Sequence, residues 1–270
     1  SSRLAQEDAT FVIDVFDCDR CSRAGSLIGL FDGHGGRGTV DFVSHALPRN
    51  LRQILCAKKR NQDESDDEFF VRALRAAFLL TDIQSKNSVV DRGSGATGVC
   101  CMLRPKHARN GESTEDLVLH VANCGDSRAV LCHEGRALRL TYDHKGEDNY
   151  EHRRLAKANG FTHAGRTLGI LAVSRSFGDH AFKEFVTADP HVVSRQLSGA
   201  QIDPFLIICC DGVWDVISDG EACVIVSGTS EEQKTDKRSL IREHDAAKRL
   251  VEEALRRGCS DNVSAVVVFF

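Results

Sequence analysis

The sequence predicts an α+β fold in which antiparallel sheets are covered by helices. Three features of the chain carry this prediction. The predicted strands mostly follow one another, and the helices come in pairs instead of alternating with strands. Several strands are short apolar runs bounded by glycine or polar residues, which is typical of buried strands. No repeat, low-complexity stretch or clear linker divides the 270 residues, so we expect one domain over residues 1–270.

The first half of the chain is predicted to contain two strands, two helices and four further strands. The strands are rich in apolar and β-branched residues. The first helix has an apolar stripe at helical spacing, and the second begins at the capping box Ser65-Asp66-Asp67-Glu68. A polar insertion at 104–116 is expected to separate two of the strands. The predicted ranges are 10–16 and 26–31 for strands, 36–58 and 65–85 for helices, and 96–103, 117–123, 128–132 and 138–141 for strands.

The second half is predicted to add three helices and two strands. Ser218-Asp219-Gly220-Glu221 is a second capping box, and Gly258 ends an amphipathic helix. A polar loop is expected at 228–239. The predicted ranges are 148–159 for a helix, 205–210 for a strand, 218–227 and 243–257 for helices, and 262–270 for the last strand.

Composition excludes several classes of protein. Apolar residues make up 41% of the chain, a proportion found in globular proteins and not in disordered ones. The 39 acidic and 35 basic residues give a net charge of −4, which argues against nonspecific binding to nucleic acid or to a membrane surface. The longest apolar runs, 205–210 and 265–270, are far shorter than the ~20 residues of a membrane-spanning helix. We therefore expect no nucleic-acid partner and no membrane span.

The cysteines indicate a reducing compartment. Most of the 11 lie inside apolar runs, where they are expected to be buried thiols. That usage predicts a cytoplasmic or nuclear protein. The CxxC pair Cys18–Cys21 has no second pair at zinc-ligand spacing, so it predicts neither a zinc site nor a redox site.

Carboxylates recur at the ends of the predicted strands. An aspartate beside a glycine is a common turn, so each occurrence alone predicts a turn. Four strand-end carboxylates together are a stronger signal, with Glu7-Asp8 before the first strand, because strand ends can converge on one rim of a sheet. Crowded carboxylates raise one another's pKa, and an all-oxygen ligand set favours Mg²⁺ or Mn²⁺ over zinc. The residues concerned are Glu7-Asp8, Asp32-Gly33, Asp126, Asp211-Gly212 and Asp261.

At this point the chain resembles the metal-dependent protein phosphatases of the PP2C (PPM) family. The resemblance extends over almost the whole chain and keeps the family's order. It implies a four-layer α-β-β-α sandwich of two antiparallel sheets flanked by helices. The matching segments are RLAQED (3–8), FDGHGG (31–36), NCGDSRAV (123–130), TYDHK (141–145), LAVSRSFGD (171–179), CDGVWDV (210–216) and SDNV (260–263).

The resemblance also implies a role for each matching residue that carries chemistry. Two Mg²⁺ or Mn²⁺ ions are expected, with a weaker third. The implied metal ligands are Asp32, which bridges the two ions, Gly33 through its carbonyl, Asp211 and Asp261 on the first ion, Glu7 on the second ion through water, and Asp126 and Asp215, with Asp211, on the third ion. Asp8 is a supporting hydrogen-bond partner beside Glu7.

The implied reaction is hydrolysis of phosphoserine and phosphothreonine in proteins. A hydroxide that bridges two metal ions is expected to attack phosphorus directly, without a phosphoenzyme. Arg3 matches the phosphate clamp, since its guanidinium can bind two phosphate oxygens. His34 matches the general acid that protonates the leaving serine oxygen. The expected partners are phosphoprotein substrates, and we expect a monomer.

Two departures and two alternatives accompany this interpretation. Gly146 and Asn159-Gly160 replace the family's usual Pro and Gly-Gly, which bears on the shape of the substrate groove. The first alternative is a pseudophosphatase, a binding or regulatory module with the same fold. The retained Asp32, Asp211 and Asp261 favour the enzyme, because such modules typically lose a metal ligand. The second alternative is a two-metal nuclease, and the absence from this sequence of a basic stripe with aromatic residues argues against it.

Overall fold

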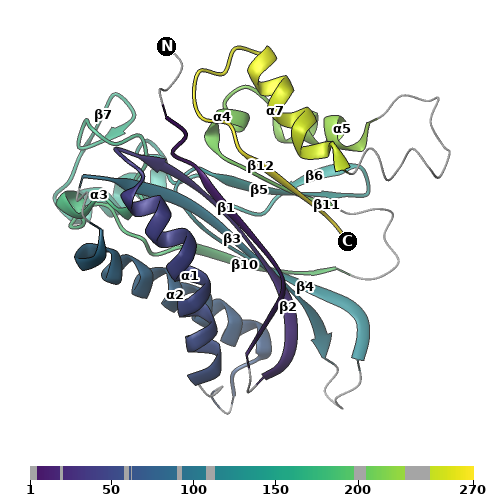
Figure 1. Cartoon of the computed structure of the whole chain (residues 1–270). Coiled ribbons are helices and arrows are strands. Elements are labelled where there is room, and N and C mark those ends of the chain that lie inside the picture. The colour runs from purple at the N-terminus through teal and green to yellow at the C-terminus, as the bar shows by residue number, and fades with distance from the viewer. Residues whose placement is uncertain are drawn as a thin grey trace.

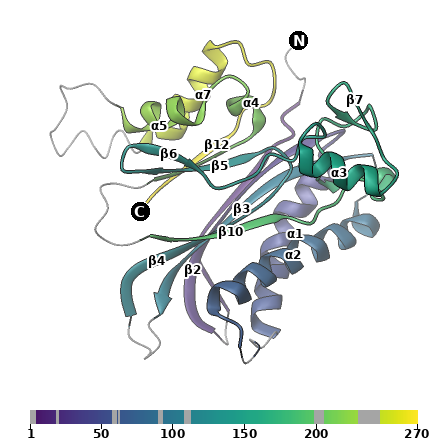
Figure 2. The same ribbon diagram turned by 180° about the vertical axis from the view of Figure 1, so that it is seen from behind.

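Two antiparallel sheets lie face to face, and helices cover the outer face of each (Figure 1). The computed structural model describes residues 5–18, 21–57, 61, 63–89, 93–107, 113–197, 205–228 and 244–270. Viewed from behind, α3 and the β7 hairpin lie together at one end of the sandwich (Figure 2). The expected four-layer α-β-β-α sandwich of the α+β class is confirmed.

All the strand pairs within the two sheets are antiparallel in the part of the chain described. The first sheet has the order β1-β2-β3-β4-β10, with β9 paired to β3. Its strands are β1 (Ala9–Cys18), β2 (Cys21–His34), β3 (Gly95–His107), β4 (Ser113–Cys124), β9 (Phe177–Gly178) and β10 (His191–Leu197). The second has the order β12-β11-β5-β6. Its strands are β5 (Arg128–His133), β6 (Arg136–Arg139), β11 (Phe205–Cys209) and β12 (Ala265–Phe269).

The helices fall into three groups. The pair on the first sheet is α1 (Gly38–Ala57) and α2 (Asp66–Ser88). The group on the second sheet is α4 (Asp211–Trp214), α5 (Asp219–Ser227) and α7 (Ala246–Arg256). The segment between β6 and β10 forms α3 (Asn149–Lys157), the hairpin β7 (Thr162–His163) and β8 (Arg166–Thr167), and the short helix η1 (His180–Phe182). Both predicted capping boxes are present, at Ser65 with Glu68 and at Ser218 with Glu221.

The alternation of side chains along β2 explains the layering. Leu27 and Phe31 point to the helices α1 and α2, whereas Ile28 and Leu30 point to the second sheet. Successive side chains of a strand point to opposite faces, so a strand that is buried on both faces must be apolar throughout. The unbroken apolar runs that predicted buried strands have this origin. The cluster between the sheets takes buried residues from both of them.

The secondary-structure prediction is wrong at β10 and at 104–116, and it did not include the short elements β7, β8, β9, η1 and α4. Strand β10 was not predicted, because it is an edge strand with mostly polar, partly exposed side chains. The stretch 104–116 is not simply an insertion, since β3 continues to His107 and β4 begins at Ser113. Arg104 is buried in β3 because it donates hydrogen bonds to Asp67 and His120. Partners from other elements therefore make a charged residue compatible with a buried strand.

The remaining chain-wide expectations can be compared with the described residues. Every cysteine whose side chain the structure describes is an unpaired thiol. Cys18 of β1 and Cys21 of β2 are opposite each other in the backbone register of the two strands. No helix in the described ranges is both long enough and apolar enough to cross a bilayer. The loop expected at 228–239 lies, apart from Gly228, outside the described residues.

A buried carboxylate fixes α3 to the segment that follows it. Glu151 is fully buried and accepts hydrogen bonds from Arg154 at 2.9 Å, Ser174 at 2.8 Å and Arg175 at 2.5 and 3.1 Å. Burial alone would raise its pKa, but the hydrogen bonds and charge of Arg175 lower the pKa of Glu151 to about 2. Glu151 therefore stays charged, and the two guanidinium groups depend on it.

Substitution of Glu151 by Ala is expected to lower the free energy of unfolding by about 3–5 kcal/mol, because removing one partner leaves a buried charge unpaired. Urea unfolding followed by circular dichroism measures this loss. Glu253 is a matched control, since it also accepts hydrogen bonds from two arginines, Arg256 and Arg257, but its side chain is 20% exposed. Glu253→Ala is expected to cost much less. Equal losses in both variants would contradict a special role for the buried network.

Candidate metal centre and active site

A cleft of about 230 Å³ opens where strands of both sheets end. Three of the predicted carboxylates line it. Asp32 comes from the end of β2, Asp126 from the turn between β4 and β5, and Asp211 from the start of α4 directly after β11. The convergence expected from the strand ends is therefore present. The cleft is lined by Asp32, His34, Thr97, Asp126, Arg166, Ile170, Leu171, Ala172, Val173 and Asp211.

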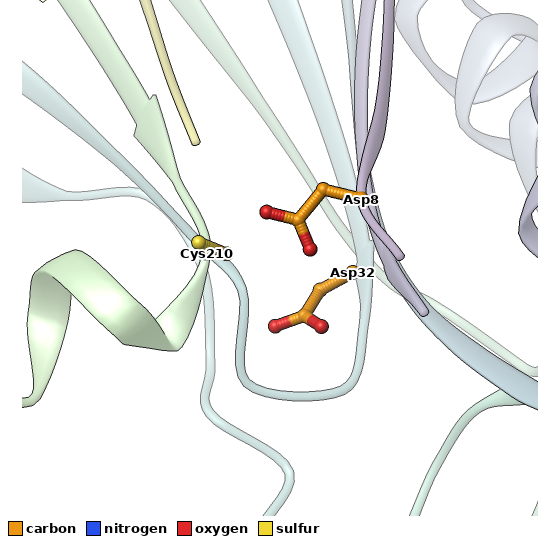
Figure 3. A group of neighbouring side chains, drawn as sticks. All are labelled: Asp8, Asp32 and Cys210. Atoms are coloured by element: carbon orange, nitrogen blue, oxygen red, sulfur yellow. The ribbon is translucent and has the colours of Figure 1, made fainter. Parts of the chain in front are cut away.

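Asp8 and Asp32 point from the first sheet toward Cys210, which lies at the end of β11 (Figure 3). One ligand atom from each of the three residues lies within 4.8 Å of the other two, and all three residues are buried. Asp8 also accepts a hydrogen bond from Ser264 Oγ at 2.6 Å. Gly33 follows Asp32 on β2 and pairs with Ala96 of β3.

Glu7 is held from two directions just before β1. Its Oε1 accepts a hydrogen bond from the Gly36 amide at 2.9 Å, and its own amide donates to Asn262 Oδ1 at 2.9 Å. Asn262 Nδ2 in turn donates to the Ala5 carbonyl at 3.1 Å. The two ends of the described chain are thus joined beside the carboxylates.

Asp215 and Asp261 both lie close enough to Asp211 to raise its pKa through their charge. Asp261 precedes β12, and its Oδ1 accepts a hydrogen bond from the Asn262 amide at 2.6 Å. The backbone approaches closely here, because a side chain on Gly212 would overlap the Asn262 carbonyl oxygen. Glycine at this position therefore allows the beginning of α4 to lie against the segment that carries Asp261.

The carboxylates strongly perturb one another. Burial, with the charges of Asp211 and Asp8, raises the pKa of Asp32 to about 10. Burial and the charge of Asp211 raise the pKa of Asp126 to about 7, and burial also raises the pKa of Asp211. Without a cation, part of the cluster must stay protonated at neutral pH. Burial is the main cause of these increases, and the charges of neighbouring carboxylates add to it.

This arrangement fits a divalent cation. Asp211 Oδ1 is buried and has no hydrogen-bond partner in the described part of the chain, so one carboxylate oxygen is available as a ligand. The surrounding carboxylates supply the hard oxygen ligands that Mg²⁺ and Mn²⁺ prefer. Cys210 Sγ is engaged elsewhere, since it accepts a hydrogen bond from the Ser264 amide at 3.2 Å.

His34 forms a pair with a residue far along the chain. Its Nε2 lies 2.8 Å from Oδ2 of Asp179, which is buried and also accepts a hydrogen bond from Ser176 Oγ at 2.5 Å. Gly95 makes this pair possible, because a side chain there would overlap both His34 and Asp179. The contact holds the imidazole ring through Nε2. Nδ1 is then the second ring nitrogen of a side chain that lines the cleft.

The structure adds residues that the sequence prediction did not assign. Residues 160–173, here called the flap, supply Arg166 and Ile170 among others to the cleft wall. Lys145 lies 3.7 Å from Asp126 and 3.8 Å from Asp215. Lys145 and Asp179 both belong to segments that carry the family resemblance, and this membership is the sequence signal that could have identified them. Arg3, the expected phosphate clamp, lies outside the described residues.

Comparisons with known proteins agree with this geometry. The family profile described as Protein phosphatase 2C matches residues 1–263. Protein phosphatase 2C homolog 1 of Schizosaccharomyces pombe is 34% identical over 242 residues, covering 90% of this chain and 63% of that protein. Protein phosphatase 2C homolog 1 of Saccharomyces cerevisiae is 36% identical over 246 residues, covering 89% of this chain and 80% of that protein. The chain thus spans just under two thirds of the first relative.

Solved structures share the fold. A Caenorhabditis elegans sex determining protein superposes with a TM-score of 0.78 at 22% identity, over 99% of this chain and 62% of that one. A serine-threonine phosphatase 2C from Toxoplasma gondii superposes with a TM-score of 0.67 at 20% identity, over 100% of this chain and 96% of that one. At these identities the similarity concerns the fold alone.

In EDTA, without divalent cations, the free energy of unfolding is expected to fall as pH rises. Folded Asp32 keeps its proton up to a pKa of about 10, whereas the unfolded chain releases it near 3.8, so the folded state binds more protons between these values. Between about pH 7 and pH 8, the free energy of unfolding in EDTA should fall by about 1 kcal/mol per pH unit from this group. The buried His120 and His144, with pKa values lowered by burial to about 3, act in the opposite direction only at lower pH.

The matched measurement is urea unfolding of Asp32→Asn at the same two pH values. This variant should lose the Asp32 contribution to the slope, and Mg²⁺ should remove it from the wild type. If wild-type protein in EDTA showed the same slope as Asp32→Asn, the raised pKa of Asp32 would be contradicted.

Proposed function

The chain belongs to the protein phosphatase 2C family, and we propose that it is a metal-dependent phosphatase that hydrolyses phosphoserine and phosphothreonine in proteins. The observation that carries this proposal is the convergence of Asp32, Asp126 and Asp211 in one cleft, with pKa values raised by burial and mutual repulsion. The shared apolar layer between the sheets and the family match over 1–263 support a single catalytic domain over residues 1–270.

Two ions, Mg²⁺ or Mn²⁺, are the proposed cofactors, with a weaker third. When bound, such ions supply hydroxide near neutral pH and positive charge beside the phosphoryl oxygens. The chain's part is to hold and orient them. The proposed ligands are Asp32, Gly33 through its carbonyl, Asp211, Asp261, Glu7 through water, and, for the third ion, Asp126 and Asp215 with Asp211; Asp8 supports them by hydrogen bonding.

Water is the proposed nucleophile, because the described wall of the cleft contains no cysteine or serine. Cys210 is the thiol closest to Asp8 and Asp32. Burial and these carboxylates raise the pKa of the Cys210 thiol far above its usual value, so it stays protonated and unreactive. A water oxygen therefore forms the new bond to phosphorus as the bond to the serine or threonine oxygen breaks, and inorganic phosphate is released.

His34 is the proposed proton donor to the leaving oxygen. Asp179 holds Nε2 of the ring, and Nδ1 can face the substrate. The leaving alkoxide of serine or threonine is strongly basic, so its departure requires a proton in the transition state. Arg3 is the proposed phosphate clamp through two parallel hydrogen bonds. The flap forms part of the cleft wall and would contact the residues around the phosphorylated side chain.

Hydrolysis of a phosphothreonine peptide is expected to require Mn²⁺ or Mg²⁺, to stop in EDTA and to recover when the ion is added back. Asp211→Asn should lower kcat/KM at least about a hundredfold, since even residues that only support metal ligands cost 10–100-fold. Phosphate release measures both effects. Asp14→Asn is the control, because Asp14 is exposed on β1, away from the cleft. Folded wild-type protein that is inactive with either metal would instead support a binding module.

Substitution of His34 by Ala is expected to slow hydrolysis of the phosphothreonine peptide by about 10²–10⁴-fold, the usual contribution of a general acid. Hydrolysis of para-nitrophenyl phosphate should slow much less, because its leaving group needs no proton. His45→Ala, an exposed histidine on α1, is the control. Equal losses on both substrates would argue against proton donation by His34.

A further inference from the structure

An ammonium group lies between the two carboxylates proposed for the third metal ion. Lys145 Nζ is 3.7 Å from Asp126 Oδ2 and 3.8 Å from Asp215 Oδ1. Asp126 is buried with only 4% of its side chain exposed, whereas Asp215 is 62% exposed. A positive charge of the chain itself therefore faces both carboxylates where a third ion would lie.

The surroundings of Lys145 favour a cation at this point. Two carboxylates, at 3.7 and 3.8 Å from Nζ, provide negative charge on two sides of the ammonium. The backbone of Lys145 is held by hydrogen bonds at both its amide and its carbonyl. Lys145 pairs with Val173 of the flap in an antiparallel bridge, and its carbonyl accepts a hydrogen bond from the Asp148 amide at 3.1 Å.

The side chain, in contrast with the backbone, has room to move. It is 39% exposed, and lysine carries its charge on a flexible four-carbon stem. Its separations from the two carboxylates exceed hydrogen-bond length, so withdrawal breaks no short hydrogen bond to either of them. A divalent cation and an ammonium repel strongly at such short range and cannot share the same carboxylate oxygens. Occupation of this place by one cation therefore requires departure of the other.

We propose that Lys145 is a built-in competitor of the third metal ion, and that this ion binds only when the Lys145 side chain withdraws from Asp126 and Asp215. The proposal rests on the proposed function, since it assumes that divalent cations bind the carboxylate cluster. Lys145 thereby weakens the third site selectively and sets the ion concentration at which this site fills. The proposed ligands of the first two ions share only Asp211 with the third site, and the ion pairs of Lys145 in the described chain are with Asp126 and Asp215, so the first two ions are affected much less.

The same residue connects the exchange to the substrate wall. Val173, the backbone partner of Lys145, lines the cleft together with Leu171 and Ala172 of the flap. Entry of a third ion would therefore displace the side chain of Lys145, whose backbone pairs with Val173 of the flap. The affinity of the third site and the position of the flap are then properties of one short stretch of chain.

The test is calorimetric titration of the whole chain with Mn²⁺, comparing wild type with Lys145→Met. The two tight binding events should be unchanged, while the dissociation constant of the third should fall about tenfold, equivalent to 1.4 kcal/mol. Lys145→Arg keeps the charge and should bind the third ion no more tightly than wild type. Lys106→Met is the matched control, since Lys106 has a similar exposure, 37%, and lies 4.0 Å from Asp116 on the far part of the sheet.

Each result has a distinct meaning. A stronger third site in Lys145→Met alone, or a third event seen only in that variant, supports the proposal. An unchanged third event, or an equal gain at all three sites, overturns it and leaves the two-ion centre intact. Absence of any Mn²⁺ binding by folded wild type would refute the metal centre itself. Lys145→Gln, read by the same titration and checked by circular dichroism, replaces Lys145→Met if the latter does not fold.

Discussion

Repulsion among buried carboxylates is the constraint on which the rest of the structure depends. Asp8, Asp32 and Asp211 lie where strands of two sheets meet, and in water they would separate. The sandwich prevents this, because each carboxylate is attached to a strand end, or to a turn beside one, that is fixed by an apolar core. The fold therefore maintains an electrostatic conflict that the proposed divalent cations would relieve. Chemistry that requires concentrated positive charge follows from this conflict.

A line of polar contacts leads from α3 to His34, the proposed proton donor. Buried Glu151 holds Arg175, the next residue Ser176 donates a hydrogen bond to Asp179, and Asp179 holds His34. The elements involved are α3, the segment before η1 and the end of β2. They lie in separate parts of the sequence. The position of one imidazole thus depends on an ion pair that does not line the cleft. Such dependence explains why charged residues are buried in this part of the molecule.

Local signals predicted much of the fold and the carboxylate set. Capping boxes mark helix starts at Ser65 and Ser218 because the bonds that define them span only three residues. Apolar runs mark the strands buried on both faces. The missed features depend on distant partners: the pair of His34 with Asp179 joins positions 145 residues apart, and Lys145 acquires its meaning only beside Asp126 and Asp215. No spacing rule contains that information, and the resemblance supplied the segments but not these contacts.

The contacts of residues 7–8 with residues 262–264 beside the carboxylates have a consequence for biosynthesis. Glu7 bonds to Asn262 and Asp8 to Ser264, across separations of 255 and 256 residues. A ribosome adds residues from the N-terminus onward at about 5–20 per second, so Asp8 and Asp32 emerge long before Asp261 and β12 exist. A nascent chain can therefore form its first sheet and helices α1 and α2 while its carboxylates remain without their last neighbours. The carboxylate cluster is therefore complete only after the segment that carries Asp261 has been synthesised, and a shorter nascent chain lacks part of the proposed ligand set.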